Sequence, residues 1–199
     1  MEITVEMVKE LRETTGAGVL DCHQTLKTYD GDMEKAVDHL REKGLEEASK
    51  RANREAVEGR IEAYTHLGDQ VAVLLELNCE TDFVARTDEF ETLAHDLALH
   101  IAFAAPTCLV REEVPEEVVE SERKSYQDQA IEEGKPEHII ERIVEGRLEK
   151  FYEQNCLMEQ PFVKDEDQTI EDLINNAVAR LGENIILRRF TRYEVGEDS

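Results

Sequence analysis

The sequence has few basic residues, few cysteines and no long apolar run. Its 23 Lys and Arg residues are outnumbered by 47 Asp and Glu residues, which gives a formal net charge of −24 at pH 7. Such a surface repels phosphate backbones, so direct nucleic-acid binding is not expected. No apolar segment reaches the length of a membrane span, and the acidic start MEITVEMVKE is unlike a signal peptide. We therefore expect an unprocessed soluble protein that binds another protein or a cationic ligand.

The four cysteines lie far apart and form no C-x-x-C pair; they are Cys22, Cys79, Cys108 and Cys156. This spacing suggests neither a zinc site nor a small disulfide framework. It is typical of a protein from the reducing cytosol, so we expect a cytoplasmic location. With 40% hydrophobic and 35% charged residues, the 199-residue chain has the composition of a globular protein.

Residues 1–55 contain three short amphipathic stripes with helical spacing. Thr4 is placed to cap the first stripe, and TTGAG at residues 14–18 ends it because glycine tolerates the angles of a tight turn. Gly44 is the expected end of the third helix, and the polar residues 45–55 are expected to form a helical linker. So small a three-helix domain has little core, which suits docking better than catalysis.

The remaining residues, 56–199, are expected to form a second domain with a small antiparallel sheet. VEGRIEAYTH and QVAVLLELNC alternate with a period of two around the turn LGD, which predicts a hairpin. The second run has Ala72 and Leu74 on its other face, so we expect a central strand that is covered on both sides near its start. NIILRRFTRYEV at the C-terminal end is the expected third strand.

Helices are expected between these strands. Thr87 is placed to cap a helix, Thr169 another, and Gly182 ends the latter. Between them, Pro115 and Pro136 open two helices joined by the short turn GKP, which predicts an antiparallel helical hairpin at about residues 115–157. The predicted fold class is α+β: a three-helix module, then a small antiparallel sheet packed with helices, with a protruding helical hairpin.

Candidate catalytic and metal-binding residues are sparse. His95 and His100 are five residues apart and so lie on different faces of a helix, which disfavours a metal site. Cys79 alternates with the inward-facing residues of its strand, which favours core packing over a nucleophile. Glu80 and Asp82 could form an acid and base pair, but no surrounding motif supports one. The basic stretch RRFTR is expected to pair with the abundant carboxylates.

The segment TDFV, residues 81–84, is expected to form a loop between the central strand and the helix that follows Thr87. Loops on a rigid scaffold often carry binding residues. Phe83 could fold under the helix as a hydrophobic staple, or it could point outward as an intruding tip. Spacing alone leaves both interpretations open.

Five segments, in this order, resemble the bacterial elongation factor Ts family, whose members are guanine-nucleotide exchange factors for elongation factor Tu. They are VKELRETTGAGVLDC, LNCETDFVAR, IVEGRLEKF, QPFVKD and RRFTRYEVGE, and the resemblance covers nearly the whole chain. It implies a head that resembles ubiquitin-associated domains, followed by an α+β core with a helical hairpin. It also implies a protein that is not an enzyme and needs no cofactor.

The resemblance also implies which residues contact elongation factor Tu. Thr81, Asp82, Phe83 and Val84 match the family segment that intrudes on the GTPase domain and dislodges the magnesium bound with GDP. A docking patch on the head is matched by Leu11, Val19 and Leu20. The chain has room for one core subdomain where longer relatives have two, and short family members pair instead, so we expect a homodimer.

Two other classes of function remain possible at this stage. An enzyme would act on a small substrate without a GTPase and would depend on Glu80, Asp82 or Cys79. A simple adaptor would retain its activity in residues 1–55 alone and would not need Phe83.

Overall fold

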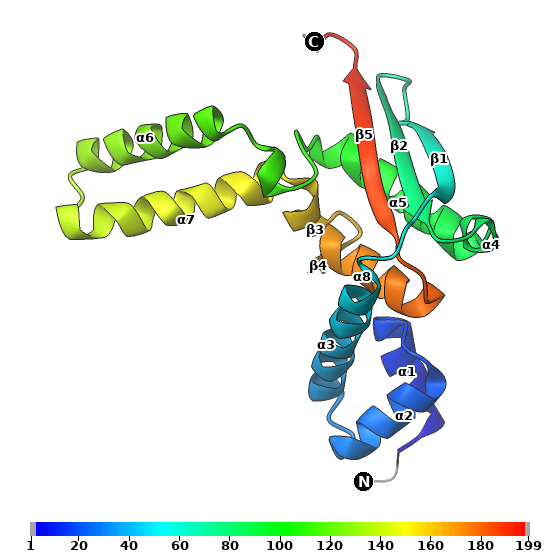
Figure 1. The fold of residues 1–199 in the computed structure, drawn as a ribbon. Helices are drawn as coiled ribbons and strands as arrows, with labels where there is room; N and C mark the ends of the chain where they lie inside the picture. The colour runs from blue at the N-terminus through cyan, green and yellow to red at the C-terminus, as the bar shows by residue number, and fades with distance from the viewer. Residues whose placement is uncertain (1–2, 198–199) are drawn as a thin grey trace. The chain divides into compact units, whose positions relative to one another are not determined.

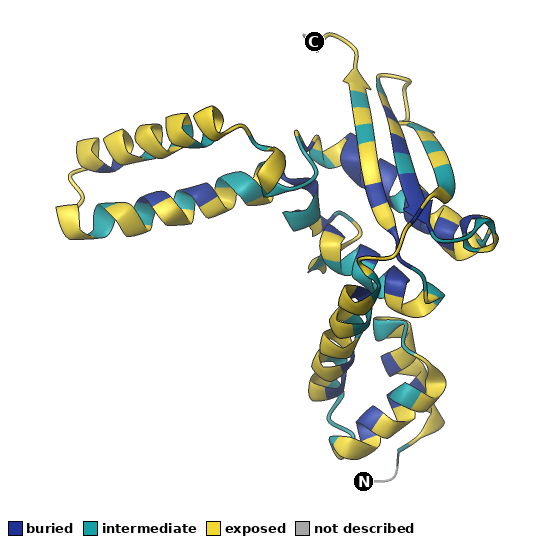
Figure 2. Ribbon diagram, viewed as in Figure 1, coloured by how far each residue is buried: buried dark blue, intermediate teal, exposed yellow. Residues whose placement is uncertain are grey.

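The computed structural model describes residues 3–197 (Figure 1). The chain separates into two compact units, one formed by the chain up to Ala98 together with the chain from Asp172, the other by Leu99–Glu171. Figure 2 shows how burial varies along the ribbon. Helices alternate with two small antiparallel sheets, which confirms the predicted α+β class. Among residues 3–197, no helix is both long enough and apolar enough to cross a bilayer.

The N-terminal residues form the three predicted helices, α1 (Val5–Thr15), α2 (Val19–Thr28) and α3 (Met33–Arg51). Thr4 caps α1 because its side-chain oxygen accepts a hydrogen bond from the Met7 backbone N–H, at 3.2 Å. Gly16 ends α1 in a left-handed conformation with φ of 68°. The helices enclose a small core of Val8, Leu11, Cys22, Leu26, Ala36 and Leu40.

Helix α3 does not end at Gly44, contrary to the prediction. A glycine inside a helix costs about 1 kcal/mol relative to alanine, which is a weak penalty. The residues after it, LEEASKR, are mostly good helix formers, and they carry α3 on to Arg51. The expected helical linker, residues 45–55, is therefore helical only as far as Arg51, as the continuation of α3, and the chain turns at residues 52–54.

The larger sheet contains β1 (Glu58–Thr65), β2 (Val71–Cys79) and β5 (Ile186–Glu194) in the order β1-β2-β5. Both pairings are antiparallel, which confirms the hairpin, the central position of β2 and the C-terminal strand. Helix α5 (Asp88–Ala104) begins after Thr87, whose hydroxyl oxygen accepts from the Phe90 N–H at 3.2 Å.

The inner face of the sheet carries the core of this unit. Val73, Leu75 and Leu77 of β2 are at most 3% exposed. The N-terminal part of α5 covers this face: the Tyr64 ring of β1 meets the His95 ring edge-on at a centroid distance of 5.3 Å, and Arg60 forms an ion pair with Glu91. The turn that follows β2 thus extends from a strand whose inner face is packed and buried.

The outer face of the sheet is exposed, so the prediction that β2 is covered on both sides is wrong. Leu74 is 48% exposed and Ala72 is also exposed. Their cross-strand neighbours Ala63 and Tyr193 are exposed as well. Alternation shows that two faces are apolar, but it does not show that this chain covers both of them.

The second unit contains the predicted helical hairpin, α6 (Glu116–Glu132) and α7 (Glu137–Asn155). Ion pairs and hydrogen bonds join the two helices: Arg123 contacts Glu145, and Arg147 contacts Gln129 and Glu133. The hairpin is flanked by two short 3-10 helices, η1 (Arg111–Glu113) and η2 (Leu157–Glu159).

A two-stranded sheet of β3 (Pro161–Phe162) and β4 (Asp165–Thr169) was not expected from the sequence. Its longer strand reads DEDQT and has no apolar alternation that would identify it. Helix α8 (Ile170–Leu181) follows directly, and Gly182 ends it with φ of 75°, as predicted.

Candidate partner-binding site

The TDFV segment, residues 81–84, lies at the end of β2 and forms a single helical turn, α4 (Asp82–Ala85), instead of the expected loop. Thr81 is its N-cap: the Thr81 hydroxyl oxygen accepts from the Val84 N–H at 3.4 Å, and its carbonyl accepts from the Ala85 N–H at 3.2 Å. Ala85 is buried and anchors the turn. The backbone of the segment is therefore ordered by its own hydrogen bonds.

Phe83 points away from the core and is 81% exposed. A hydrophobic staple would bury this ring against the following helix, so the structure excludes that interpretation. Asp82 beside it forms an exposed ion pair with Arg86 at 2.9 Å. Val84 is partly buried. The turn thus presents one large apolar ring next to one carboxylate.

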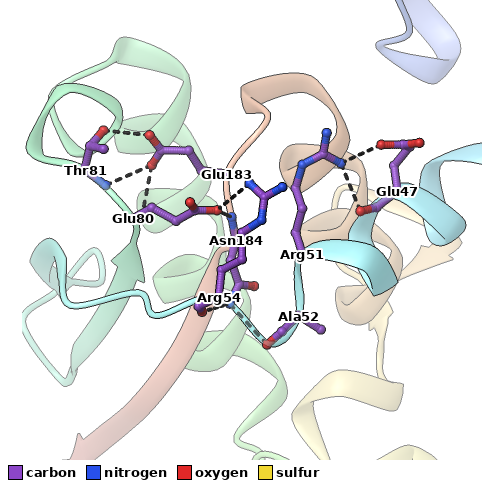
Figure 3. A network of polar contacts seen from close by, with 8 residues as sticks. All are labelled: Glu47, Arg51, Ala52, Arg54, Glu80, Thr81, Glu183 and Asn184. Carbon is purple, nitrogen blue, oxygen red and sulfur yellow. Dashed lines mark hydrogen bonds and ion pairs between the residues drawn. The ribbon is translucent and has the colours of Figure 1, made fainter.

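Glu183, in the connection between α8 and β5, holds the start of this turn (Figure 3). One carboxylate oxygen accepts from the backbone N–H groups of Glu80 and Thr81, at 3.1 and 3.0 Å. The other accepts from the Thr81 hydroxyl at 2.6 Å. Hydrogen bonds to a charged acceptor are roughly twice as strong as neutral ones. Glu183 therefore fixes the position from which Phe83 projects.

The next residue, Asn184, joins the same region to the end of the helical linker (Figure 3). Its backbone N–H donates to the Glu80 carboxylate at 2.7 Å. Its side-chain amide donates to the carbonyls of Ala52 and Arg54, at 3.3 and 2.7 Å. Asn184 is only 4% exposed, so these bonds satisfy a buried polar group.

Sequence reasoning missed Glu183 and Asn184. They lie more than 100 residues from Glu80 and Thr81 along the chain, and no local spacing connects the two pairs. The only local signal was two polar residues directly after Gly182, the end of α8.

The residues around this segment do not support a catalytic role for Cys79 as a nucleophile or for Glu80 as an acid or base. Cys79 is fully buried, and its thiol donates to the Thr81 carbonyl at 3.1 Å. Burial, followed by the negative charge of Glu183, raises the pKa of the Cys79 thiol to about 11, so the thiolate is scarce at neutral pH. Glu80 is occupied by Asn184 and Arg54. These groups position the turn and do not form a poised nucleophile or base.

The other candidates have structural partners. His95 is exposed and lies beside Glu62. His100 is buried, with one ring nitrogen 2.9 Å from the Gln160 side-chain oxygen and the other accepting from the Val163 N–H. Burial lowers the pKa of His100, which keeps it neutral near pH 7. Within residues 3–197, no group of three or more His, Cys, Asp and Glu side chains is arranged to hold a metal ion.

The RRFTR stretch pairs with carboxylates, as predicted. Arg189 contacts Glu76 at 2.8 Å, and Arg192 contacts Glu194 and Glu197.

The head residues of the predicted docking patch differ in exposure. Leu11 is fully buried in the core between α1, α2 and α3. Val19 and Leu20, at the start of α2, are 55% and 78% exposed. Val19 and Leu20 are therefore accessible to a partner, whereas Leu11 is not.

Comparison with known proteins gives a consistent result. The family described as Elongation factor TS matches residues 4–197. Elongation factor Ts of Moorella thermoacetica is 56% identical over 190 residues, which cover 96% of this chain and 94% of the relative. Elongation factor Ts of Syntrophomonas wolfei is 56% identical over 195 residues, which cover 98% and 91% of the two chains. The chain therefore belongs to the elongation factor Ts family of translation elongation factors.

Proposed function

We propose that this protein is a guanine-nucleotide exchange factor for elongation factor Tu. It binds the GDP form in the cytoplasm, promotes release of GDP and leaves a nucleotide-free partner that GTP can fill. It makes and breaks no covalent bond and uses no cofactor. Its net charge of −24 disfavours direct contact with nucleic acid, so its partner surface is that of a protein.

The observation that carries this proposal is the exposed ring of Phe83 on a turn that is held from below. An isolated exposed phenylalanine is common, but this one stands on a turn fixed by the Thr81 cap and by three hydrogen bonds to Glu183. A pre-organised apolar group loses little conformational freedom on binding, which favours its use as a wedge. We assign Phe83 to a position between helices of the GTPase domain of elongation factor Tu.

Asp82 provides the polar part of the proposed mechanism. Its ion pair with Arg86 is exposed, and such pairs contribute only about 0–1 kcal/mol, so Asp82 can exchange its partner at little cost. In the complex, Asp82 competes in the polar network that supports the magnesium ion of elongation factor Tu. Magnesium neutralises the phosphates of GDP, so displacing its supports weakens nucleotide binding. Thr81 and Val84 complete this contact at the two ends of the turn.

The head is proposed to dock on the same GTPase domain through Val19 and Leu20, while the buried Leu11 contributes to the core that holds the three helices of the head together. Asn184 hydrogen-bonds both to the end of the linker that follows the head and to Glu80, which directly precedes the segment that carries Phe83. The linker and the turn are therefore held by the same residue.

Thermodynamic linkage gives a test of this function that does not depend on rates. If the chain weakens GDP binding by a given factor, GDP must weaken binding of the chain by the same factor. Calorimetry should therefore give tighter binding to nucleotide-free elongation factor Tu than to its GDP form, by at least about tenfold. Equal affinities for the two forms would contradict the proposed function.

We further propose that two copies associate through the outer sheet face, defined by Ile61, Ala63, Ala72, Leu74 and Tyr193. Ile61 and Tyr193 are 55% and 70% exposed, and the cross-strand pairs Ala63 with Leu74 and Ala72 with Tyr193 make the face continuous. Two chains of charge −24 repel each other, so a contact between them needs a face with little uncompensated charge. Glu76 on this face is already paired with Arg189. Packing of two such faces gives a sandwich of the two sheets.

Replacing Leu74 with lysine should convert the dimer to a monomer. In a symmetric dimer the substitution enters the interface twice and places two ammonium groups in an apolar contact, so we expect the dimer dissociation constant to rise by about 100-fold or more. Sedimentation velocity at micromolar concentration measures this. Leu67→Lys is the matched control, because Leu67 is 91% exposed in the turn between β1 and β2 and lies outside the defined face. A monomeric wild-type chain, or a Leu74→Lys chain that remains dimeric, would disprove the proposed interface.

A further inference from the structure

Cys108 and Cys156 lie side by side at the base of the helical hairpin. Cys108 precedes η1 and α6, Cys156 follows α7, and their backbones form an isolated parallel bridge. The Cys108 N–H donates to the Asn155 carbonyl at 3.3 Å, and the Leu157 N–H donates to the Cys108 carbonyl at 3.0 Å. The two segments, although 48 residues apart, are thus fixed next to each other by main-chain hydrogen bonds.

The two sulfur atoms are 3.4 Å apart, close to contact distance, and both thiols are reduced. Neighbouring backbone segments paired in this way lie about 4.8 Å apart, which is within the range of Cα separations that a disulfide spans. The sulfurs must approach to about 2.05 Å, which rotation of the side chains on this fixed backbone can provide. The geometry therefore needs no rearrangement of the main chain.

A clamp of charged and aromatic groups holds the same region. The Arg111 guanidinium donates to Glu149 of α7 and to Glu159 of η2, and it lies over the Tyr152 ring at 4.5 Å from the centroid. Arg111 thereby joins the segment before α6 to the segments at the end of α7. These contacts hold the two ends of the hairpin together and so keep the two thiols next to each other.

The two cysteines differ in accessibility. Cys108 is partly exposed, whereas Cys156 is fully buried. Burial, followed by the neighbouring Cys108 sulfur, raises the pKa of Cys156 to about 12, so Cys156 retains its proton. An oxidant in solution therefore meets Cys108 first, and Cys156 is the group placed to react second.

We propose that Cys108 and Cys156 form a reversible modification site, where a low-molecular-weight disulfide such as oxidised glutathione converts the two thiols to an intrachain disulfide. The Cys108 thiolate attacks one sulfur of the small disulfide, and the first small thiolate leaves. Cys156 then gives up its proton and attacks the Cys108 sulfur, and the second small thiolate leaves. Two electrons pass from the protein to the small disulfide, and the two thiol protons end on the released small thiols.

The bond closes a covalent ring that contains η1, α6 and α7. It keeps the two ends of the hairpin together when the hydrogen bonds at its base open. Cys22 and Cys79 serve as internal controls that should not be oxidised. Both are buried, and their thiols donate to the backbone carbonyls of Ala17 and Thr81 respectively.

The test uses the full-length chain incubated with oxidised glutathione and then denatured, alkylated and analysed by mass spectrometry. Before alkylation, the oxidised chain should weigh about 2 Da less than the reduced chain, because two thiol hydrogens are lost. After alkylation, two of the four thiols should carry the label, and a disulfide should link the peptides that contain Cys108 and Cys156. Dithiothreitol should reverse the change fully. Cys156→Ser should stop at a single glutathione adduct on Cys108, and Cys22→Ser should form the link as the wild type does. Four alkylated thiols, a stable glutathione adduct on the wild-type chain, or a link only between two chains would overturn the proposal.

Discussion

Replacing Phe83 with alanine should slow the release of GDP from elongation factor Tu by about 30-fold, because an aromatic hot spot contributes about 2 kcal/mol or more to an interface. The ring is 81% exposed in the free protein, so its removal leaves the fold intact and withdraws only the proposed wedge. Stopped-flow fluorescence of labelled GDP measures the effect. Circular dichroism should show an unchanged thermal transition.

Phe103→Ala is the matched control for this substitution. Phe103 is also a phenylalanine of high exposure, 76%, but it lies near the end of α5 and not on the turn. Its removal should change the release rate by less than about twofold if exposed aromatic surface alone has no effect. A Phe83→Ala protein that folds and promotes release as the wild type does would refute the wedge.

Replacing Glu183 with alanine should reduce the acceleration of GDP release by at least about tenfold, because this carboxylate holds the start of the turn. The substitution removes the acceptor of two backbone N–H groups and of the Thr81 hydroxyl. Glu183→Gln is the matched variant. Its amide oxygen can still accept from the two N–H groups and its amide nitrogen can donate to the hydroxyl, so most of the acceleration should return.

A double-mutant cycle distinguishes positioning of the turn from a general loss of stability. If Glu183 acts through Phe83, then Glu183→Ala added to Phe83→Ala should lower the release rate by less than about threefold further. Fully additive losses in the double variant would show that Glu183 does not position the Phe83 ring. An unchanged rate in the folded single variant Glu183→Ala would lead to the same conclusion.

Short-range sequence patterns predicted the helices and strands whose start, end or face is set by neighbouring residues in the sequence. The caps Thr4 and Thr87, the alternation of β1 and β2, and the prolines before α6 and α7 identified helices and strands that the structure contains. Gly44 was misleading because a single glycine opposes a helix too weakly to end it when good helix formers follow. The strand β4 was missed because its polar sequence has no apolar alternation.

The positions that matter most for the proposed site depend on distant parts of the chain. Spacing could not choose between a staple and an outward tip, because the choice rests on the exposure of Phe83 in three dimensions. It also could not identify Glu183 and Asn184, whose partners are more than 100 residues away. The alternation around Leu74 correctly predicted that the second face of β2 is apolar. It could not predict whether another part of the chain, or a second copy of it, covers that face, because local spacing carries no information about distant contacts.

The most direct test is the rate at which labelled GDP leaves elongation factor Tu in the presence of magnesium and excess unlabelled nucleotide. We predict that this chain at micromolar concentration accelerates release by at least about 1,000-fold, and that the acceleration shrinks when magnesium is chelated, because the metal that the turn is proposed to displace is then already absent. Release of GDP at the same rate with and without the chain would contradict its assignment as an exchange factor.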